Sequence, residues 1–403
     1  ALVAAARLAA DVDAEAKALL SAASALSWVD RERCLVAVDE AAALCRFIGE
    51  DLLRAHVRGY CGYWHFLLRS WRDQDAEACA HAVQTAREAN DRPLMSLHTP
   101  RYALFQALRS EYSEAVRLAR EGMRLAVETG DPFDYMLCHF CAAWGLLHEG
   151  EWAGMLRVLE SGMKAAERNG HRLWDLLFHV EVGWLHQRAF SYESSLRICE
   201  HLLTKGAGKS FPLSHLMILV LEAFAYLGLE RWEQARQSFA EIASITGRGR
   251  ILMDWMWQRQ LQYGYAVYWF AQDDLGKAKA EAEELCRQAE HPRERTLLAL
   301  GHRMLAKIAS HEGDLKSCHA HLAQAIEVVA HGQAPLAAWQ VYETAAQLLP
   351  GNSTGYWVRS AHILECLMEQ IAGERDLRES LAGSERVKNI LAFAGSTAVT
   401  VGR

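Results

Sequence analysis

One short stretch of the chain carries the residues of a nucleotide-binding loop. Residues 206–210 read GAGKS, and a P-loop ends in the same way, with backbone N–H groups and a lysine that hold phosphates. The complete motif needs another glycine where Leu203 stands, and it must follow a strand and open a helix. Here the stretch follows a helical pattern and precedes Pro212, so a loop between two helices is the simpler interpretation.

Two groups of histidines and cysteines have types of side chain that ligate metal ions. Cys138 and Cys141, with His139 between them, have the spacing of half a zinc site, but no second pair follows at a suitable distance. The second group is made of His311, Cys318, His319 and His321. Histidines on the exposed face of a helix explain that group more simply, so we expect neither a metal site nor a bound cofactor.

The sequence offers no constellation of catalytic residues. It has no serine on a glycine elbow, no kinase loop and no glycine-rich dinucleotide fingerprint. Paired carboxylates such as Glu283 and Glu284 fall on charged helix faces, which are typical of solvated surface. These observations predict that the protein is not an enzyme and that its function depends on binding.

The composition favours helices and disfavours two classes of partner. Hydrophobic residues make up 51% of the 403 residues and only 7 are prolines, which is typical of an all-α protein. The formal net charge is -7 without a basic block, so direct binding to nucleic acid is not expected. No apolar run reaches the roughly 20 residues that span a bilayer, so no membrane partner is expected either. The 10 cysteines lack the clustered spacing of a disulfide framework, which indicates reduced thiols in a cytoplasmic protein.

A residue that closes a tight turn recurs along the chain at intervals of 40 residues, each time ahead of a stretch with helical periodicity. The series runs Glu32, Arg72, Tyr112, Trp152, Tyr192, Trp232 and, after a three-residue insertion, Leu275 and Leu315. We term these the turn residues. Self-similarity with a period of 20 to 50 residues indicates a solenoid of repeated helix pairs.

Small side chains recur at two places relative to the turn residues. Nine residues before them stand Ala103, Ala143, Gly183, Ala223, Ala266 and Ala306. Three residues after them stand Ala115, Ser195, Ala235, Ala278 and Cys318. A small residue allows two helices to approach closely, so we predict that the first helix of each pair meets its partner at the earlier place. Leucine at Ala143 or Gly183 should then overpack the helix pair.

Helical periodicity and short connections predict an array of antiparallel helix pairs. Single helices are expected at 2–26 and 31–49. The expected pairs are 52–69 with 75–89, 94–108 with 113–129, 133–148 with 153–169, 172–188 with 193–204, 213–227 with 233–245, 251–270 with 276–289, and 294–310 with 316–330. Residues 1–350 are thus predicted to form a repeat array of about eight helix pairs. Residues 351–403 are predicted to form capping helices and, after Gly395, a frayed tail.

The small residue in the first helix, the aromatic at the turn and the alanine early in the second helix together resemble the tetratricopeptide repeat. The resemblance covers roughly residues 30–350, but the period is 40 instead of 34 and glycine replaces the usual proline after the second helix. It implies a right-handed α–α superhelix. The long helices with glycine stops, and the closing segments APLAAWQVYETAAQLL and LRESLAGSERVKNILAFAG, resemble the sensor regions of bacterial STAND ATPases, which include the MalT-like transcription regulators.

Aromatic residues also recur on the first helices, eight or twelve residues before a turn residue. In the family that the chain resembles, neighbouring places line a concave groove that holds a peptide. The candidates for such a groove are Tyr60, Trp64, Phe140, Trp144, Trp184 and Tyr263, with Arg101, Arg172 and Arg259 near them as partners for an acidic segment. The alternative is that the rings are core residues, which pack each first helix against the next repeat.

Three roles remain open. The first is a protein-interaction and ligand-sensing scaffold, the sensor arm of a larger bacterial STAND-type signalling or transcription regulator. Its partners would be a protein or peptide segment, a small-molecule effector, or an ATPase module of the same polypeptide. The second role is a stand-alone peptide-binding adaptor. The third is the substrate platform of a nucleotide-dependent enzyme, which requires that the chain itself bind a nucleotide.

Overall fold

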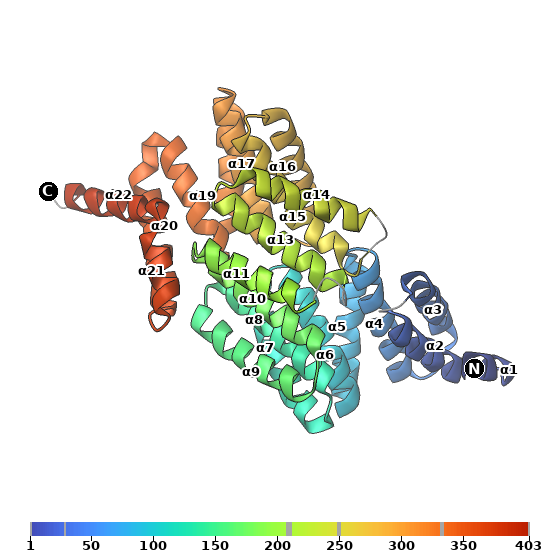
Figure 1. The fold of residues 1–403 in the computed structure, drawn as a ribbon. Coiled ribbons are helices and arrows are strands. Elements are labelled where there is room, and N and C mark those ends of the chain that lie inside the picture. The colour runs from blue at the N-terminus through green and yellow to red at the C-terminus, as the bar shows by residue number, and fades with distance from the viewer. Residues whose placement is uncertain (1, 28–29, 207–211, 248–250, 331–333, 402–403) are drawn as a thin grey trace.

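The computed structural model describes residues 2–27, 30–206, 212–247, 251–330 and 334–401 (Figure 1). These residues form helices joined by short connections, and no strand occurs among them. Consecutive helices pack against each other along the chain, which confirms the predicted all-α repeat array. The helices are α1 (Leu2–Leu8), α2 (Val12–Leu26), α3 (Arg31–Leu44), α4 (Asp51–Leu68), α5 (Asp73–Glu88), α6 (Arg92–Leu108), α7 (Tyr112–Thr129), α8 (Pro132–Glu149), α9 (Trp152–Arg168), α10 (Arg172–Arg188), α11 (Tyr192–Thr204), α13 (Pro212–Gly228), α14 (Trp232–Thr246), α15 (Asp254–Ala271), α16 (Leu275–Glu290), α17 (Arg295–His311), α18 (Leu315–Val329), α19 (Pro335–Leu348), α20 (Ser353–Gln370), α21 (Arg375–Gly383) and α22 (Glu385–Val401), with 3-10 turns η1 (Cys45–Phe47) and η2 (Pro350–Asn352).

Six of the eight turn residues begin the second helix of a pair, whereas Arg72 is the N-cap of α5 and Glu32 is the second residue of α3. Tyr112, Trp152, Tyr192, Trp232, Leu275 and Leu315 are the first residues of α7, α9, α11, α14, α16 and α18. The ring of Trp152 is fully buried, and its indole N–H donates to the carbonyl of Leu147 near the end of α8 at 3.1 Å. The helix before it ends at Gly150, whose φ of +80° is a left-handed conformation that glycine adopts without strain. One buried ring thus fills the corner between two helices.

Small residues at the place nine residues before the turn residues are buried between helices. Ala103, Ala143, Ala223, Ala266 and Ala306 are all fully buried. A Cβ added at Gly183, which holds the same place in α10, would lie 2.3 Å from Cδ2 of Leu221 on α13. Because α13 is the first helix of the next repeat, Gly183 controls the packing between repeats. The expectation that it meets the second helix of its own pair was wrong.

Replacing Gly183 with leucine is expected to lower the free energy of unfolding by about 1 to 3 kcal/mol. The new side chain would overlap Leu221, which is itself fully buried. Ala143→Leu, at the same place in α8, should act in the same direction, and denaturant unfolding measures both. Gly154→Ala is the control, because the nearest atom to a Cβ there is Leu146 Cδ2 at an ordinary 3.5 Å. Leucine variants as stable as the parent would show that the predicted register is wrong.

The array winds so tightly that its later helices return to its earlier ones. Figure 1 shows helices α13–α17 in the upper part of the array and α5–α11 in the lower part. The indole N–H of Trp255 on α15 donates to the carbonyl of Phe66 on α4 at 2.8 Å, across 189 residues of sequence. Further along, the guanidinium of Arg295 on α17 pairs with Glu111 at the start of α7 at 2.8 Å. Successive turns of the superhelix therefore stack directly on each other.

The C-terminal helices continue this stacking. α19 and α20 pack against each other as a further pair, and they contact α8 and α9 respectively. The division predicted at residue 350 falls between the two helices of this pair. α22 packs on α20 and runs through Gly395 to Val401, so the tail that we expected to fray is helical. Upstream contacts anchor this helix, because Phe393 stacks on Trp357 with ring centroids 4.9 Å apart.

The N-terminal stretch is not the single helix that we expected over residues 2–26. It forms α1 and α2, with a break at residues 9–11. Ala10 adopts a φ of +53°, and the carboxylate of Asp11 accepts a hydrogen bond from the backbone N–H of Ala14 at 2.9 Å. Asp11 is thus the N-cap of α2, and the extended backbone of an N-cap residue cannot also continue the preceding helix.

Candidate functional site

A cavity of about 240 Å³ lies at the centre of the superhelix, between its first helices. Its wall is formed by α4, α6, α8, α10, α13 and α15, which are the first helices of six successive repeats, and by the end of α2. Most of the lining side chains are aromatic or aliphatic. The cavity is larger than the engineered cavity of about 150 Å³ that is known to bind benzene. It is therefore large enough for a small organic molecule.

Three tryptophans of this wall have no hydrogen-bond partner for the indole N–H among the residues that the structure describes. They are Trp64 on α4, Trp174 on α10 and Trp257 on α15, and none is more than 6% exposed. A buried N–H without a partner costs free energy, and such groups are rare in native proteins. The residues that line the cavity thus include buried donors that no described acceptor satisfies.

Among the described residues that line the cavity, Arg101 is the charged one. It is buried, lies over the rings of Tyr60 and Tyr63 at 5.4 and 5.1 Å, and donates from Nη1 to Asp134 at 2.7 Å. Its Nε has no hydrogen-bond partner. Burial alone lowers the pKa of Arg101, but Asp134 and the two tyrosines more than offset this, so the guanidinium remains charged. The cavity therefore has a cationic donor beside an aromatic wall.

The structure brings four of the nine predicted groove residues to this cavity. They are Tyr60, Trp64, Arg101 and Phe140. Trp144 and Trp184 lie next to them, with their rings 6.3 and 6.5 Å from the ring of Trp257. All six side chains are less than a tenth exposed. Between these helices the interior is filled by rings that contact each other across the superhelix, because the array closes on itself, and the space that remains is the cavity.

The other three predicted residues lie apart from it. Arg259 is buried in an ion pair with Glu294 at 3.1 Å. Arg172 begins α10 on the exposed surface and donates to the carbonyl of Lys205 at 3.2 Å. Tyr263 lines a second cavity, formed between α10–α15 and the C-terminal helices. The three arginines that were predicted to bind an acidic segment therefore do not converge on one site.

Sequence reasoning missed Trp174 and Trp257, although a signal for them was present. Both stand 18 residues before a turn residue, namely Tyr192 and Leu275. The place 15 residues before the turn residues holds three more lining side chains, Leu137, Leu177 and Met217. A search at the places eight and twelve residues before the turn finds only part of the wall, because each first helix faces the centre along most of its length.

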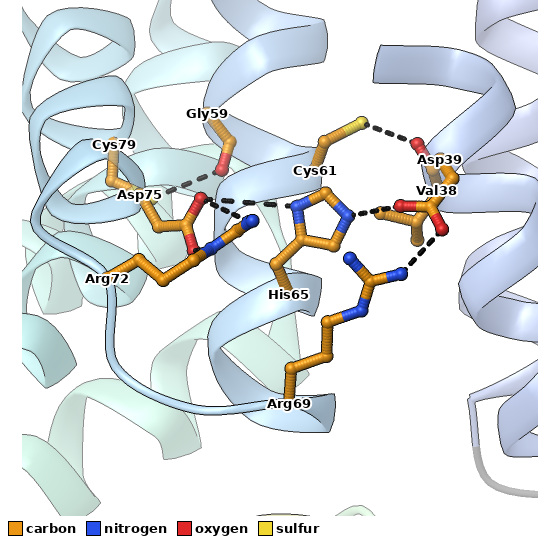
Figure 2. A network of polar contacts seen from close by, with 9 residues as sticks. All are labelled: Val38, Asp39, Gly59, Cys61, His65, Arg69, Arg72, Asp75 and Cys79. Carbon is orange, nitrogen blue, oxygen red and sulfur yellow. Dashed lines mark hydrogen bonds and ion pairs between the residues drawn. The ribbon is translucent and has the colours of Figure 1, made fainter. Parts of the chain in front are cut away.

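A separate group of titratable side chains joins α3, α4 and α5 (Figure 2). His65 lies between two carboxylates, with Nε2 at 2.8 Å from Asp39 Oδ1 and Nδ1 at 4.0 Å from Asp75 Oδ1. Arg69 pairs with Asp39 at 2.6 Å, and Arg72 pairs with Asp75 at 2.7 Å. Burial lowers the pKa of His65 against the opposing effect of Asp39, so the ring is neutral at neutral pH. This alternation of charges holds three helices together and does not line either cavity.

Two thiols lie beside this group, and their ionisation decides whether it could do nucleophilic chemistry (Figure 2). Cys61 donates to the carbonyl of Val38 at 3.5 Å, and Cys79 donates to the carbonyl of Gly59 at 3.1 Å. Burial raises the pKa of both thiols well above the ordinary value, so neither supplies a thiolate near neutral pH. The group is best explained as a structural joint. All ten cysteines of the chain are free.

Two of the residues considered as metal ligands in the sequence have other partners in the structure. The thiol of Cys141 contacts the carbonyl of Pro100 at 3.7 Å, and Nδ1 of His139 lies 2.9 Å from the carbonyl of Tyr135. In the ranges that the structure describes, no three His, Cys, Asp or Glu side chains are arranged to hold a metal ion. The P-loop-like stretch extends into residues 207–211, which lie outside the described residues.

Comparison with known proteins adds little to this geometry. No family profile matches the sequence, and no curated protein is significantly similar to it. The fold is similar to the crystal structure of a Rap protein complexed with Competence and Sporulation Factor, with 9% identity, a TM-score of 0.44, and coverage of 95% of this chain and 99% of that chain. It is also similar to the APC/C hetero-tetramer Cut9-Hcn1, with 11% identity, a TM-score of 0.35, and coverage of 98% and 95%. Similarity at this level carries no inference about a ligand or partner.

The class of the protein follows from its own helices, and it is an all-α repeat array. None of the helices in the described ranges has both the length and the hydropathy to span a bilayer.

Proposed function

We propose that this chain is a ligand-sensing scaffold, in which the cavity at the centre of the superhelix binds a small amphipathic molecule. The observation that carries this proposal is the convergence of the first helices of six repeats on one cavity. The apolar wall would bind the body of the ligand, and the donors of Trp64, Trp174, Trp257 and Arg101 would bind an acceptor oxygen.

Occupancy of the cavity would be coupled to the closure of the superhelix. The backbone N–H of Met253 donates to the carbonyl of Leu67 at 2.9 Å, and this bond joins the start of α15 to α4. Both residues also line the cavity. A molecule that contacts them binds the closed form better than an open one and therefore stabilises it. A sensor needs such a link between its ligand and the relative positions of distant repeats.

Binding of small amphipathic molecules tests the proposal. Octanoate, benzoate and the corresponding alcohols are titrated into the full chain, with calorimetry and thermal unfolding as readouts. We expect at least one of them to bind and to raise the Tm. Met217→Trp, which places a large ring in the cavity, should abolish that binding. If the parent binds none of these molecules, or if Met217→Trp binds as the parent does, the cavity is not a ligand site.

Trp174→Phe and Trp184→Phe form a matched pair for the same experiment. Both indole N–H groups are buried without a partner, but only Trp174 lines the cavity. We expect Trp174→Phe to weaken the binding of an acceptor-bearing ligand by about threefold to tenfold, the worth of one hydrogen bond. Trp184→Phe should leave the affinity unchanged, and equal effects of the two variants would argue against this position of the ligand.

The wider setting of the scaffold is also part of the proposal. It would be the sensor arm of a larger bacterial STAND-type regulator, would have no catalysis of its own and would work in the cytoplasm. The repeat pattern, the closing segments of the sequence and the free cysteines support this setting. An ATPase module encoded upstream in the same reading frame would favour it. Binding of an extended peptide instead of small molecules would favour a stand-alone adaptor, and nucleotide binding by the isolated chain would favour the platform of an enzyme.

A further inference from the structure

A second cavity, of about 770 Å³, lies between the helices α10–α15 and the C-terminal helices α19, α21 and α22. No residue lines both cavities. Aromatic rings form much of the wall, with Phe224 and Tyr263 stacked at 6.2 Å and Phe190 at 6.0 Å from Trp339. The volume lies within the range of about 300 to 1,000 Å³ that is typical of ligand pockets.

Arg386 lines this second cavity, and two more cations, Arg303 and Lys307, lie near it without lining the cavity. Arg386 donates from Nε to Glu343 at 2.7 Å, while Arg303 reaches the same carboxylate at 3.5 Å. Burial and the charges of Arg303 and Arg386 lower the pKa of Lys307 to about 8, so a third cation belongs to this group. Glu343 is buried, and its carboxylate interacts with all three of these cations, which together lower its pKa against the opposing effect of burial.

Arg188 also lines the cavity, and its guanidinium has no partner among the described residues. Its guanidinium forms no hydrogen bond or ion pair with any residue that the structure describes, and its Nε is buried. Its guanidinium lies 5.5 Å from the centroid of the Trp184 ring, and the tyrosines Tyr192 and Tyr263 line the same cavity. Burial lowers the pKa of Arg188, because partial removal from water disfavours the charged form. A partly desolvated charge without a counter-charge is less favourable than one that an anion compensates.

The carboxylates at the edge of the second cavity do not neutralise this wall. Glu230, Glu379 and Glu385 line the cavity, but all three are exposed to solvent. Glu379 pairs with Arg375 and Glu385 pairs with Lys388, at 2.7 Å in each case. These carboxylates therefore leave Arg188 without a counter-charge among the described residues, beside the aromatic rings of the lining.

We propose that the second cavity binds a small organic anion, whose phosphate or carboxylate groups pair with Arg188 and Arg386 and whose apolar part lies against Tyr263 and Trp339. The planar fork of arginine suits the oxygens of a carboxylate and of a phosphate alike. Because Arg386 and Trp339 come from α22 and α19, the anion joins the C-terminal helices to the middle of the array. The site is separate from the first cavity, so either proposal can fail alone.

Calorimetry on the full chain with pyrophosphate, citrate and ADP tests this site, and the probe that binds distinguishes a phosphate from a carboxylate ligand. We expect at least one of the three to bind. Arg188→Gln should weaken that binding about tenfold or more, the loss expected for a hydrogen bond to a charged group. Arg236→Gln is the matched control, because Arg236 lies exposed on α14 and pairs with Glu233. It should bind as the parent does, and so should Met217→Trp, which alters only the first cavity.

Thermal unfolding separates a binding role of Arg188 from a structural one. In the absence of the anion, Arg188→Gln should have a Tm equal to or above that of the parent, because it removes an unpaired charge. It should also lose the rise in Tm that the bound anion gives the parent. Failure of all three probes to bind the parent, undiminished binding to Arg188→Gln, or a lower Tm of Arg188→Gln without anion would each overturn the proposal.

Discussion

Replacing Trp257 with alanine is expected to lower the free energy of unfolding by about 3 to 5 kcal/mol. Trp257 is 1% exposed and lies between two other indole rings, 6.3 Å from Trp144 and 6.5 Å from Trp184. Its removal leaves a void where α8, α10 and α15 meet. Helices that are held by neighbours on both sides cannot close such a void, so the cavity cost adds to the lost burial. Denaturant unfolding at constant m value measures the loss.

Two comparisons show whether these rings belong to the core or to a binding groove. Trp144→Ala combined with Trp184→Ala should lose about 3 to 5 kcal/mol for each ring, since both are buried. Trp357→Ala on α20, whose ring is only partly buried, should lose less. If the double variant unfolded like the parent and had lost only the binding of a partner, the rings would be groove contacts and the core interpretation would be wrong.

Replacing Glu181 with glutamine is expected to stabilise the protein strongly above pH 8. Glu181 is fully buried in α10, and neither carboxylate oxygen has a hydrogen-bond partner in the described part of the chain. Burial raises the pKa of this carboxyl from its ordinary value of 4.5 to about 8. In the unfolded chain the group loses its proton near pH 4.5, so the stability of the parent falls as the pH rises from 4.5 and levels off above 8. The full loss is roughly 3 to 5 kcal/mol.

Denaturant unfolding of the parent and of Glu181→Gln at pH 5, 7 and 9 tests this expectation. The difference between them should grow with pH, and any fixed cost of burying the amide cancels in that comparison. Glu200→Gln, which changes an exposed side chain on α11, should give a curve parallel to that of the parent. A difference that does not change between pH 5 and pH 9 would show that Glu181 is ionised or solvated in the folded protein.

The local features of the fold could be predicted because each depends on a few neighbouring residues. The turn residues mark the starts of α7, α9, α11, α14, α16 and α18, and the small residues nine positions earlier are buried. A helix break such as that at Asp11 was also readable in principle, since aspartate is a strong N-cap. The neighbours of the small residues were harder to predict. The sequence places Gly183 on a packing face, but it does not say whether that face meets α11 or α13.

The cavities could not be predicted, because they depend on the curvature summed over many repeats. A small change in the angle between repeats would separate Trp255 from Phe66, which are 189 residues apart, and the interior would then be an open groove. The same closure turns Trp144 and Trp184 toward Trp257. The lack of a partner for Arg188 could not be predicted either, because the sequence does not show which charged residues meet in space.

The stacking of α15 on α4 and of α17 on α7 changes how the array can come apart. An open solenoid loses repeats from its ends one at a time, because each repeat contacts only its neighbours. Here the unfolding of α15 would also remove the hydrogen bond and the ring contact that Trp255 makes with Phe66 on α4. Unfolding is then more nearly all-or-none, and refolding must close a loop of 189 residues before these contacts form. A chain assembled from local repeats thereby acquires the cooperativity, and the slower folding, of a globular domain.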